Sequence, residues 1–145
     1  MTNNAGELFE EGYNCAQAVL LAHCEKLRMD KQTALKLAAP FGGGMGRLRE
    51  VCGAVSGMFM TLGLKEGYTD AKDSESKKAL YEKVQTLAKK FEEEYGSIIC
   101  RELLNLEEKH SDSTPEKRTQ KYYEKRPCKE IVQFAANLIE KELNI

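Results

Sequence analysis

Apolar residues recur at intervals of three and four along most of the chain, the spacing that places them on one face of an α-helix. A stripe from Leu8 to Leu27 predicts one helix with Cys15 on its apolar face, and a shorter helical segment over 33–39 stops at Pro40. After a glycine-rich loop, a stripe from Val51 to Leu62 predicts a central helix. The first half of the chain is therefore expected to be helical apart from that loop.

The next segment predicts a long amphipathic helix followed by a short one. Asp73 or Ser74 can cap the long helix, and Gly96 can end it. Ser97 can then cap a short helix that runs through Leu104.

The last part of the chain begins with a polar connection over 107–126, and a final helix follows Pro127. No stretch alternates apolar and polar residues as a half-buried strand does. The expected fold class is all-α. The length is that of one domain, so we expect residues 1–145 to form a compact single-domain bundle of about five to six helices.

The balance of charges gives no global electrostatic basis for binding nucleic acid or an anionic membrane, because the chain has 22 basic and 23 acidic residues. The basic run over 117–129 contains Tyr122 and Tyr123, but glutamates dilute it, and we interpret it as a solvated helix. No apolar stretch approaches the roughly 18 residues that span a bilayer, and no basic segment precedes the first apolar run. We expect a cytoplasmic protein with no nucleic-acid or membrane partner, and an oligomer stays open.

The chain has five cysteines, at positions 15, 24, 52, 100 and 128. Structural disulfides are rare in a reducing compartment, so thiols are the expected state. Cysteines kept for chemistry in such a compartment are more often catalytic or metal-binding, although any single free cysteine is more often a buried apolar residue. The surroundings of each cysteine therefore decide which of them are candidates.

Glycines gather around Cys52. The glycines of segment 42–46 permit positive φ values, so this loop can turn sharply or present amides to an anion. A phosphate-binding loop would follow a strand and present a lysine, and the sequence offers neither. In the central helix, Gly53 and Gly57 allow a neighbouring helix to approach beside Cys52. We expect the Cα atoms of Cys15 and Cys52 to lie within about 7 Å, close enough for a disulfide.

Two other cysteines are expected in the first turns of helices. Cys100 comes three residues after a candidate cap, and Cys128 directly follows Pro127. The positive end of a helix dipole and nearby basic residues lower the pKa of a thiol, so we expect both to be activated thiols. Cys24 lies off the helix face of Cys15, and we expect a packing or surface thiol there.

Two charged or titratable residues stand close to the candidate cysteines in the sequence. Arg49 is one turn before Cys52 and could stabilise its thiolate. His23 lies two turns from Cys15 on the same predicted helix face. We interpret His23 as a hydrogen-bonded helix histidine rather than as a base for that thiol.

The order of the cysteines resembles a family of redox-active proteins with a C-GCAxxG-C-C type cysteine pattern and a CGAxxG motif. Residues 52–57 read CGAVSG, and residues 12–17, GYNCAQ, are similar to the family's N-terminal cysteine segment. Two further cysteines fall where the third and fourth of the family are expected, and the resemblance covers essentially the whole chain. It implies redox activity, with these candidate catalytic residues: Cys15, Cys52, Cys100 and Cys128.

Three functions stay open. In the first, two or more of these four cysteines alternate between dithiol and disulfide and exchange electrons with an unknown partner protein or small oxidant, as a thiol-disulfide oxidoreductase would. In the second, the same four cysteines hold a metal, either Zn or an iron-sulfur cluster, although the usual C-x-x-C pairs are missing. In the third, they are packing residues of a helical interaction module. The cofactor is unknown, and four cysteines allow three disulfide pairings.

Overall fold

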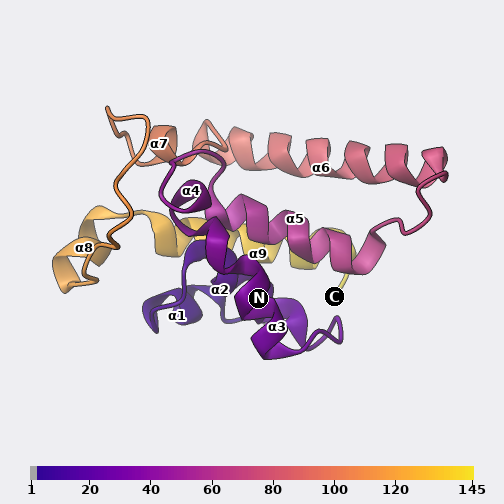
Figure 1. Ribbon diagram of the computed structural model, residues 1–145, viewed down its shortest axis with the longest axis horizontal. Helices are drawn as coiled ribbons and strands as arrows, with labels where there is room; N and C mark the ends of the chain where they lie inside the picture. The colour runs from indigo at the N-terminus through magenta and orange to yellow at the C-terminus, as the bar shows by residue number, and fades with distance from the viewer. Residues whose placement is uncertain (1–2) are drawn as a thin grey trace.

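The computed structural model describes residues 3–145, which form the all-α fold that the sequence predicts (Figure 1). The expected number of five to six helices is too low, because the expected first helix divides in two and short helices occur within the connections. Within residues 3–145 no strand forms, and the nearest feature is an isolated antiparallel bridge between Val51 and Ile99. In the same range, no helix is both long enough and apolar enough to cross a membrane.

The expected first helix is interrupted at Gly12, which separates α1 (Ala5–Glu10) from α2 (Cys15–Cys24). The φ value of Gly12 is +116°, a conformation that a helix cannot contain and that glycine tolerates best. The new helix starts with a capping box, in which the side chains of Asn14 and Gln17 each accept a hydrogen bond from the other residue's amide. Apolar spacing continues across this break, which is why the pattern suggested one helix.

A helical segment close to the predicted one follows as α3 (Lys31–Ala38), capped by Asp30, whose carboxylate accepts a hydrogen bond from the amide of Thr33 at 3.0 Å. The chain continues into the 3-10 helix η1 (Ala39–Phe41) and the short α4 (Gly42–Met45). Two glycines within α4 and the one that ends it have positive φ values. The glycine loop therefore turns the chain sharply, as expected.

The central and long helices are α5 (Gly53–Glu66) and α6 (Ser74–Tyr95), and the short helix α7 (Cys100–Leu103) follows. Asp73 caps α6 through a 3.0 Å hydrogen bond from an amide in its first turn, and Gly96 ends it with a φ value of +86°. Both ends of α6 agree with the prediction.

The polar connection ends in α8 (Gln120–Lys125), a short helix within the basic run 117–129 that the sequence predicts as a solvated helix. Thr119 caps it by accepting a hydrogen bond from the amide of Tyr122 at 3.2 Å. The last helix, α9 (Cys128–Leu143), begins directly after Pro127. Its start agrees with the preference of proline for helix N-termini.

The main core lies where α2, α5 and α9 pack together, and α6 covers it through Leu87 and Phe91. A second, smaller cluster of buried residues joins α2 to α3. Buried side chains of the three central helices include Val19, Val55, Met58, Leu62, Val132, Ala135 and Ile139.

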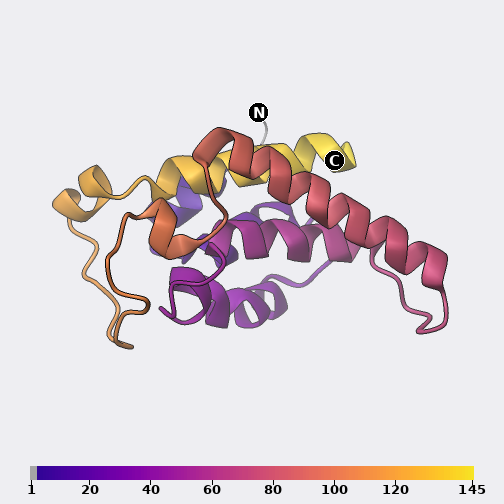
Figure 2. The same cartoon turned by 90° about the horizontal axis from the view of Figure 1, so that it is seen from above.

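The helices are distributed unequally between the two ends of the molecule. Figures 1 and 2 show α4, α7 and α8 at the same end, together with the beginnings of α5 and α9. The beginning of α6 extends beyond the core at the opposite end. Several helix N-termini therefore meet at one end of the fold.

Candidate functional site

Four cysteines line one cavity of about 440 Å³ at the end where these helices begin. Amides at a helix N-terminus carry partial positive charge and favour a thiolate there. We call this space the cysteine cavity. Each cysteine stands at the N-terminus of a different helix: Cys15 begins α2, Cys52 is the N-cap of α5, Cys100 begins α7 and Cys128 begins α9.

Cys15 lies at the cavity because Asn14 caps α2. The side-chain oxygen of Asn14 accepts from the amide of Gln17 at 2.9 Å, and its Nδ2 donates to the carbonyl oxygen of Ala39 at 3.0 Å. The chain passes so close that a Cβ on Gly42 would lie 2.6 Å from the Asn14 side chain. The sequence predicts Cys15 on the apolar face in the middle of a helix. The structure corrects this prediction, because Cys15 is the first residue of α2.

Cys52 and Cys100 are brought together by the pairing of two extended segments. The amide of Cys52 donates to the carbonyl of Ile98 at 2.7 Å, and the amide of Cys100 donates to the carbonyl of Glu50 at 2.6 Å. Both cysteines directly follow the partners of the antiparallel bridge, so their side chains face the same side. Both are buried, and a Cβ on Gly44 would lie 2.6 Å from the Cβ of Cys100.

Cys15 and Cys128 are half-buried, and their side chains share a hydrogen bond. Cys15 also lies close to the start of α5, because a Cβ on Gly53 would be 3.0 Å from the Cβ of Cys15. The close approach expected beside Cys52 is therefore present. The expected Cα separation of Cys15 and Cys52 stays a prediction, and the hydrogen-bonding partner of Cys15 is Cys128.

The hydrogen bond from Cys15 lowers the pKa of Cys128, and the guanidinium groups of Arg126, Arg118 and Arg49 lower it further against the effect of burial. The same hydrogen bond, together with burial, raises the pKa of Cys15 well above its ordinary value. Within the pair, ionisation is therefore favoured at Cys128 over Cys15, which is the direction expected for an activated Cys128.

The two buried cysteines have raised pKa values. Burial raises the pKa of Cys52 to about 12, although the amides of Ala54 and Val55 act in the opposite direction. Burial also raises the pKa of Cys100, and Arg49 only partly opposes this. The expected activation of Cys100 is therefore wrong in direction. The sequence suggests Arg49 as a partner of Cys52. In the structure, Nη1 of Arg49 instead donates a hydrogen bond to the sulfur of Cys100 at 3.6 Å.

The polar connection covers one side of the cavity and is fastened to the glycine loop. Arg49 Nε donates to the hydroxyl of Ser111 at 2.9 Å, and Arg47 Nε donates to the carbonyl of Asp112 at 2.6 Å. The amide of Ser111 donates in return to the carbonyl of Arg47 at 2.8 Å. The connection thereby contributes cavity-lining residues that no sequence motif marks as candidates: Ser113, Pro115, Glu116 and Arg118.

Arg118 and Arg126 complete the basic lining. Arg118 donates to the carbonyl oxygens of Phe9 and Tyr13, and its Cζ lies 4.1 Å from the centre of the Phe9 ring. Arg126 forms an ion pair with Glu116 at 2.5 Å. In the sequence, Arg118 stands in a run that we interpreted as solvated, and no local signal separates it from its neighbours.

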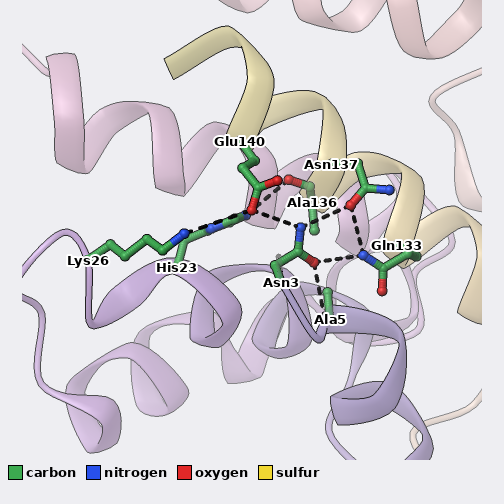
Figure 3. Close-up of polar contacts among 8 residues, drawn as sticks. All are labelled: Asn3, Ala5, His23, Lys26, Gln133, Ala136, Asn137 and Glu140. Carbon is green, nitrogen blue, oxygen red and sulfur yellow. Dashed lines mark hydrogen bonds and ion pairs between the residues drawn. The ribbon is translucent and has the colours of Figure 1, made fainter. Parts of the chain in front are cut away.

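The remaining cysteine and the helical histidine lie outside the cavity lining. Cys24 is fully buried in the cluster between α2 and α3, and its thiol donates to the carbonyl of Leu21 at 3.3 Å, so it is a packing thiol. His23 is also buried, and its Nε2 donates to the carbonyl of Ala136 at 3.0 Å (Figure 3). The prediction of a hydrogen-bonded helix histidine is confirmed.

The four candidate metal ligands share a cavity without forming a preorganised metal site. Among residues 3–145, no three histidine, cysteine, aspartate or glutamate side chains are arranged to hold one metal ion. A structural Zn site needs four ligands at bonding distance in a tetrahedron. Metal binding by the four cysteines would therefore require their side chains to move together.

Comparison with known proteins agrees with the order of the cysteines. A family model described as "Putative redox-active protein (C_GCAxxG_C_C)" matches residues 13–142. No curated protein and no solved structure matches the chain.

Proposed function

The chain belongs to the family described as "Putative redox-active protein (C_GCAxxG_C_C)", and from this premise we propose that Cys128 and Cys15 form a dithiol that exchanges electrons with the disulfide of a partner molecule. The observation that carries the proposal is the hydrogen bond between the two thiols, with the pKa of Cys128 lowered and that of Cys15 raised. Both residues are also partly exposed, whereas Cys52 and Cys100 are buried. A partner disulfide can therefore reach this pair first.

In the first step, the Cys128 thiolate attacks one sulfur of the partner disulfide. A bond forms between Cys128 Sγ and that sulfur, the partner's S–S bond breaks, and the other sulfur leaves as a thiolate. Attack depends on the fraction of thiolate, so the lowered pKa of Cys128 increases its rate near neutral pH.

In the second step, Cys15 resolves the mixed disulfide. Its proton passes to the departing thiolate, and Cys15 Sγ attacks Cys128 Sγ, which releases the second partner sulfur. The pair is oxidised by two electrons to a disulfide, and the partner disulfide is reduced to one thiol and one thiolate, which takes its proton from solvent. The reverse sequence reduces the protein again, so the direction depends on the potential of the partner.

Cys52 and Cys100 are proposed as secondary thiols of the same site. Their raised pKa values keep them protonated near neutral pH, so they do not compete with Cys128 for the first attack. They line the same cavity and could receive a disulfide from the outer pair by exchange. The physiological partner and the cytoplasmic location stay part of the proposal.

Peptide mapping of the protein after reaction with a small neutral disulfide tests this function. One equivalent of bis(2-hydroxyethyl) disulfide, added anaerobically to reduced protein, should yield a peptide pair linked through Cys15 and Cys128. Cys15→Ser should retain the reagent as a mixed disulfide on Cys128, and Cys128→Ser should form neither product. Cys24→Ser is the matched control and should behave as the wild type. A first disulfide between Cys15 and Cys52, or an adduct found first on Cys100, would contradict the proposal.

Metal binding by the four cysteines is the alternative, and it is favoured by their presence in one cavity. Metal analysis of anaerobically purified protein, combined with thiol counting, separates the two. A stoichiometric Zn ion or iron-sulfur cluster whose removal exposes all four thiols would replace the dithiol proposal. A protein without reactive thiols in either state would instead be a helical interaction module.

A further inference from the structure

The lining of the cysteine cavity is strongly basic, whereas the chain as a whole is nearly neutral. The whole sequence contains 22 basic residues and 23 acidic ones. Guanidinium groups are thus concentrated where the reactive thiols lie. The charged residues other than cysteine that line the cavity are Arg47, Arg49, Arg118, Arg126 and Glu116.

Most of these guanidinium groups have uncharged hydrogen-bond acceptors. Arg47 and Arg118 donate to backbone carbonyl oxygens. Arg49 is buried and donates to the hydroxyl of Ser111 as well as to a cysteine sulfur. The glutamate of the lining pairs with Arg126. These contacts fix the positions of the arginines, yet they leave most of the positive charge without a compensating carboxylate.

The cavity has the size and the walls of a small-molecule site. Its volume of about 440 Å³ lies within the range of about 300–1,000 Å³ that is usual for ligand pockets. Phe9, Tyr122 and Ile131 supply apolar surface beside the arginines. An apolar cavity with a few fixed charged groups suits a small molecule that has an aliphatic body and anionic ends.

We propose that the cysteine cavity binds a small disulfide that carries carboxylate groups, with Arg47 and Arg118 receiving the carboxylates and Cys128 attacking the disulfide. A planar guanidinium pairs with a carboxylate through two parallel hydrogen bonds, which gives orientation as well as affinity. The cavity already contains one guanidinium–carboxylate ion pair, in which Arg126 Nη2 donates to Glu116 Oε1. The proposal rests on the dithiol function above, and it names the class of its substrate.

The charge of the cavity also suits the products of the exchange. Each attack expels a thiolate, and each of the two products carries a carboxylate as well as its sulfur. Guanidinium groups at the site stabilise the negative charge that develops on the leaving sulfur. The bonds formed and broken are those of the two exchange steps, and the carboxylate-bearing disulfide is the oxidant that accepts the two electrons.

Three disulfides with similar skeletons and different charges test the substrate class. They are 3,3'-dithiodipropionate, which is anionic, bis(2-hydroxyethyl) disulfide, which is neutral, and cystamine, which is cationic. Each rate with reduced protein is divided by the rate of the same reagent with free 2-mercaptoethanol, which removes differences between leaving groups. At low ionic strength the anionic reagent should react about tenfold faster than the neutral one on this scale. Equal normalised rates, or a preference for cystamine, would overturn the inference.

Arg47 provides the sharpest variant, because it lines the cavity but is not among the groups that lower the pKa of Cys128. Arg47→Gln should reduce the ratio of anionic to neutral rates by about threefold, as expected for one partly solvated guanidinium. Arg28→Gln removes an exposed arginine outside the cavity and is the control, which should keep the wild-type ratio. A lowered ratio in both variants would show only a net-charge effect and would overturn the assignment.

A binding measurement without exchange separates the two proposals. Suberate replaces the two sulfurs of dithiodipropionate by methylene groups, and 1,8-octanediol is its uncharged counterpart. Suberate should slow the alkylation of Cys128 by iodoacetamide about fivefold at saturation, and the diol should not. If suberate protects Cys128 but no disulfide forms, the anion site is supported and the exchange function is contradicted. If the disulfide forms without a charge preference and without protection by suberate, the exchange function is supported and the anion site is contradicted.

Discussion

The thiol of Cys15, at the start of α2, donates a hydrogen bond to the sulfur of Cys128, at the start of α9. This hydrogen bond joins two helix N-termini within an arginine-rich lining. Each of these favours negative charge on sulfur. Which sulfur carries that charge determines the pKa of Cys128 and the order in which the cysteines are alkylated.

Replacing the donor should raise the pKa of Cys128. In Cys15→Ala the hydrogen bond is lost, so the midpoint of the pH profile for alkylation of Cys128 should move to higher pH. Cys15→Ser retains a hydroxyl donor of similar length, and its midpoint should lie between those of the wild type and Cys15→Ala. The profiles are measured with iodoacetamide and mass spectrometry of the Cys128 peptide. An unchanged midpoint in Cys15→Ala would show that the thiol of Cys15 does not stabilise the thiolate.

The cysteines should also differ in their order of alkylation. Near neutral pH, Cys128 should react first, because its pKa is lowered and its side chain is partly exposed. Cys24 and Cys52 should react late, because both are buried and have raised pKa values. Alkylation of denatured, reduced protein is the control, and there the differences should largely disappear. A native protein in which Cys24 reacts before Cys128 would contradict the order.

Some features of the site could be predicted from sequence because local chemistry decides them. Proline before Cys128 and the glycines beside Cys52 are readable signals for a helix start and a close contact, and the structure contains both. The capping box of Asn14 and Gln17 was also readable, but uninterrupted apolar spacing concealed the break at Gly12.

Other features of the site depend on contacts between distant parts of the chain. Arg118 reaches the carbonyls of Phe9 and Tyr13, and Arg49 reaches Cys100 because residues 50–52 pair with residues 98–100. Nothing local distinguishes Arg118 from a solvated arginine, and the position of Arg49 one turn before Cys52 suggested that cysteine as its partner, not Cys100. The rise in the pKa of Cys100 has the same origin, since burial depends on which segments cover it.

The glycine contact in α5 gives a prediction for stability. A Cβ on Gly57 would lie 2.8 Å from the carbonyl oxygen of Ala16 and 2.9 Å from the Cβ of Val19, and the backbone of α2 cannot move away without disturbing the core. Gly57→Ala should therefore lower the free energy of unfolding by about 1–3 kcal/mol. Urea denaturation measures the effect.

Gly63 in the same helix is the matched control for this change. It is exposed, and an added Cβ there would meet nothing within 4 Å. Gly63→Ala should raise the free energy of unfolding by about 0.5–1 kcal/mol, because alanine loses less conformational entropy in a helix. If both variants change stability in the same direction and by the same amount, the close approach of α2 and α5 does not require glycine at position 57.

The last prediction concerns pH and begins from the surroundings of His23, which are drawn in Figure 3. Burial lowers the pKa of His23 below its ordinary value of 6.5, and the charge of Lys26 acts in the same direction. The hydrogen bond to the Ala136 carbonyl and the nearby Glu140 oppose that shift without reversing it. Within the described residues, Nδ1 has no hydrogen-bond partner. The folded protein therefore holds a neutral imidazole, with its hydrogen on Nε2.

Because the folded pKa is the lower one, the unfolded chain binds more protons as the pH falls below about 6.5, and folding stability should decrease there by up to about 1.4 kcal/mol per pH unit. Above that pH the contribution is fully present. Urea unfolding between about pH 5.5 and 8 measures this slope, and His23→Gln, which keeps an N–H donor for the Ala136 carbonyl, should flatten it. A slope that persists unchanged in His23→Gln would show that some other group carries the pH dependence.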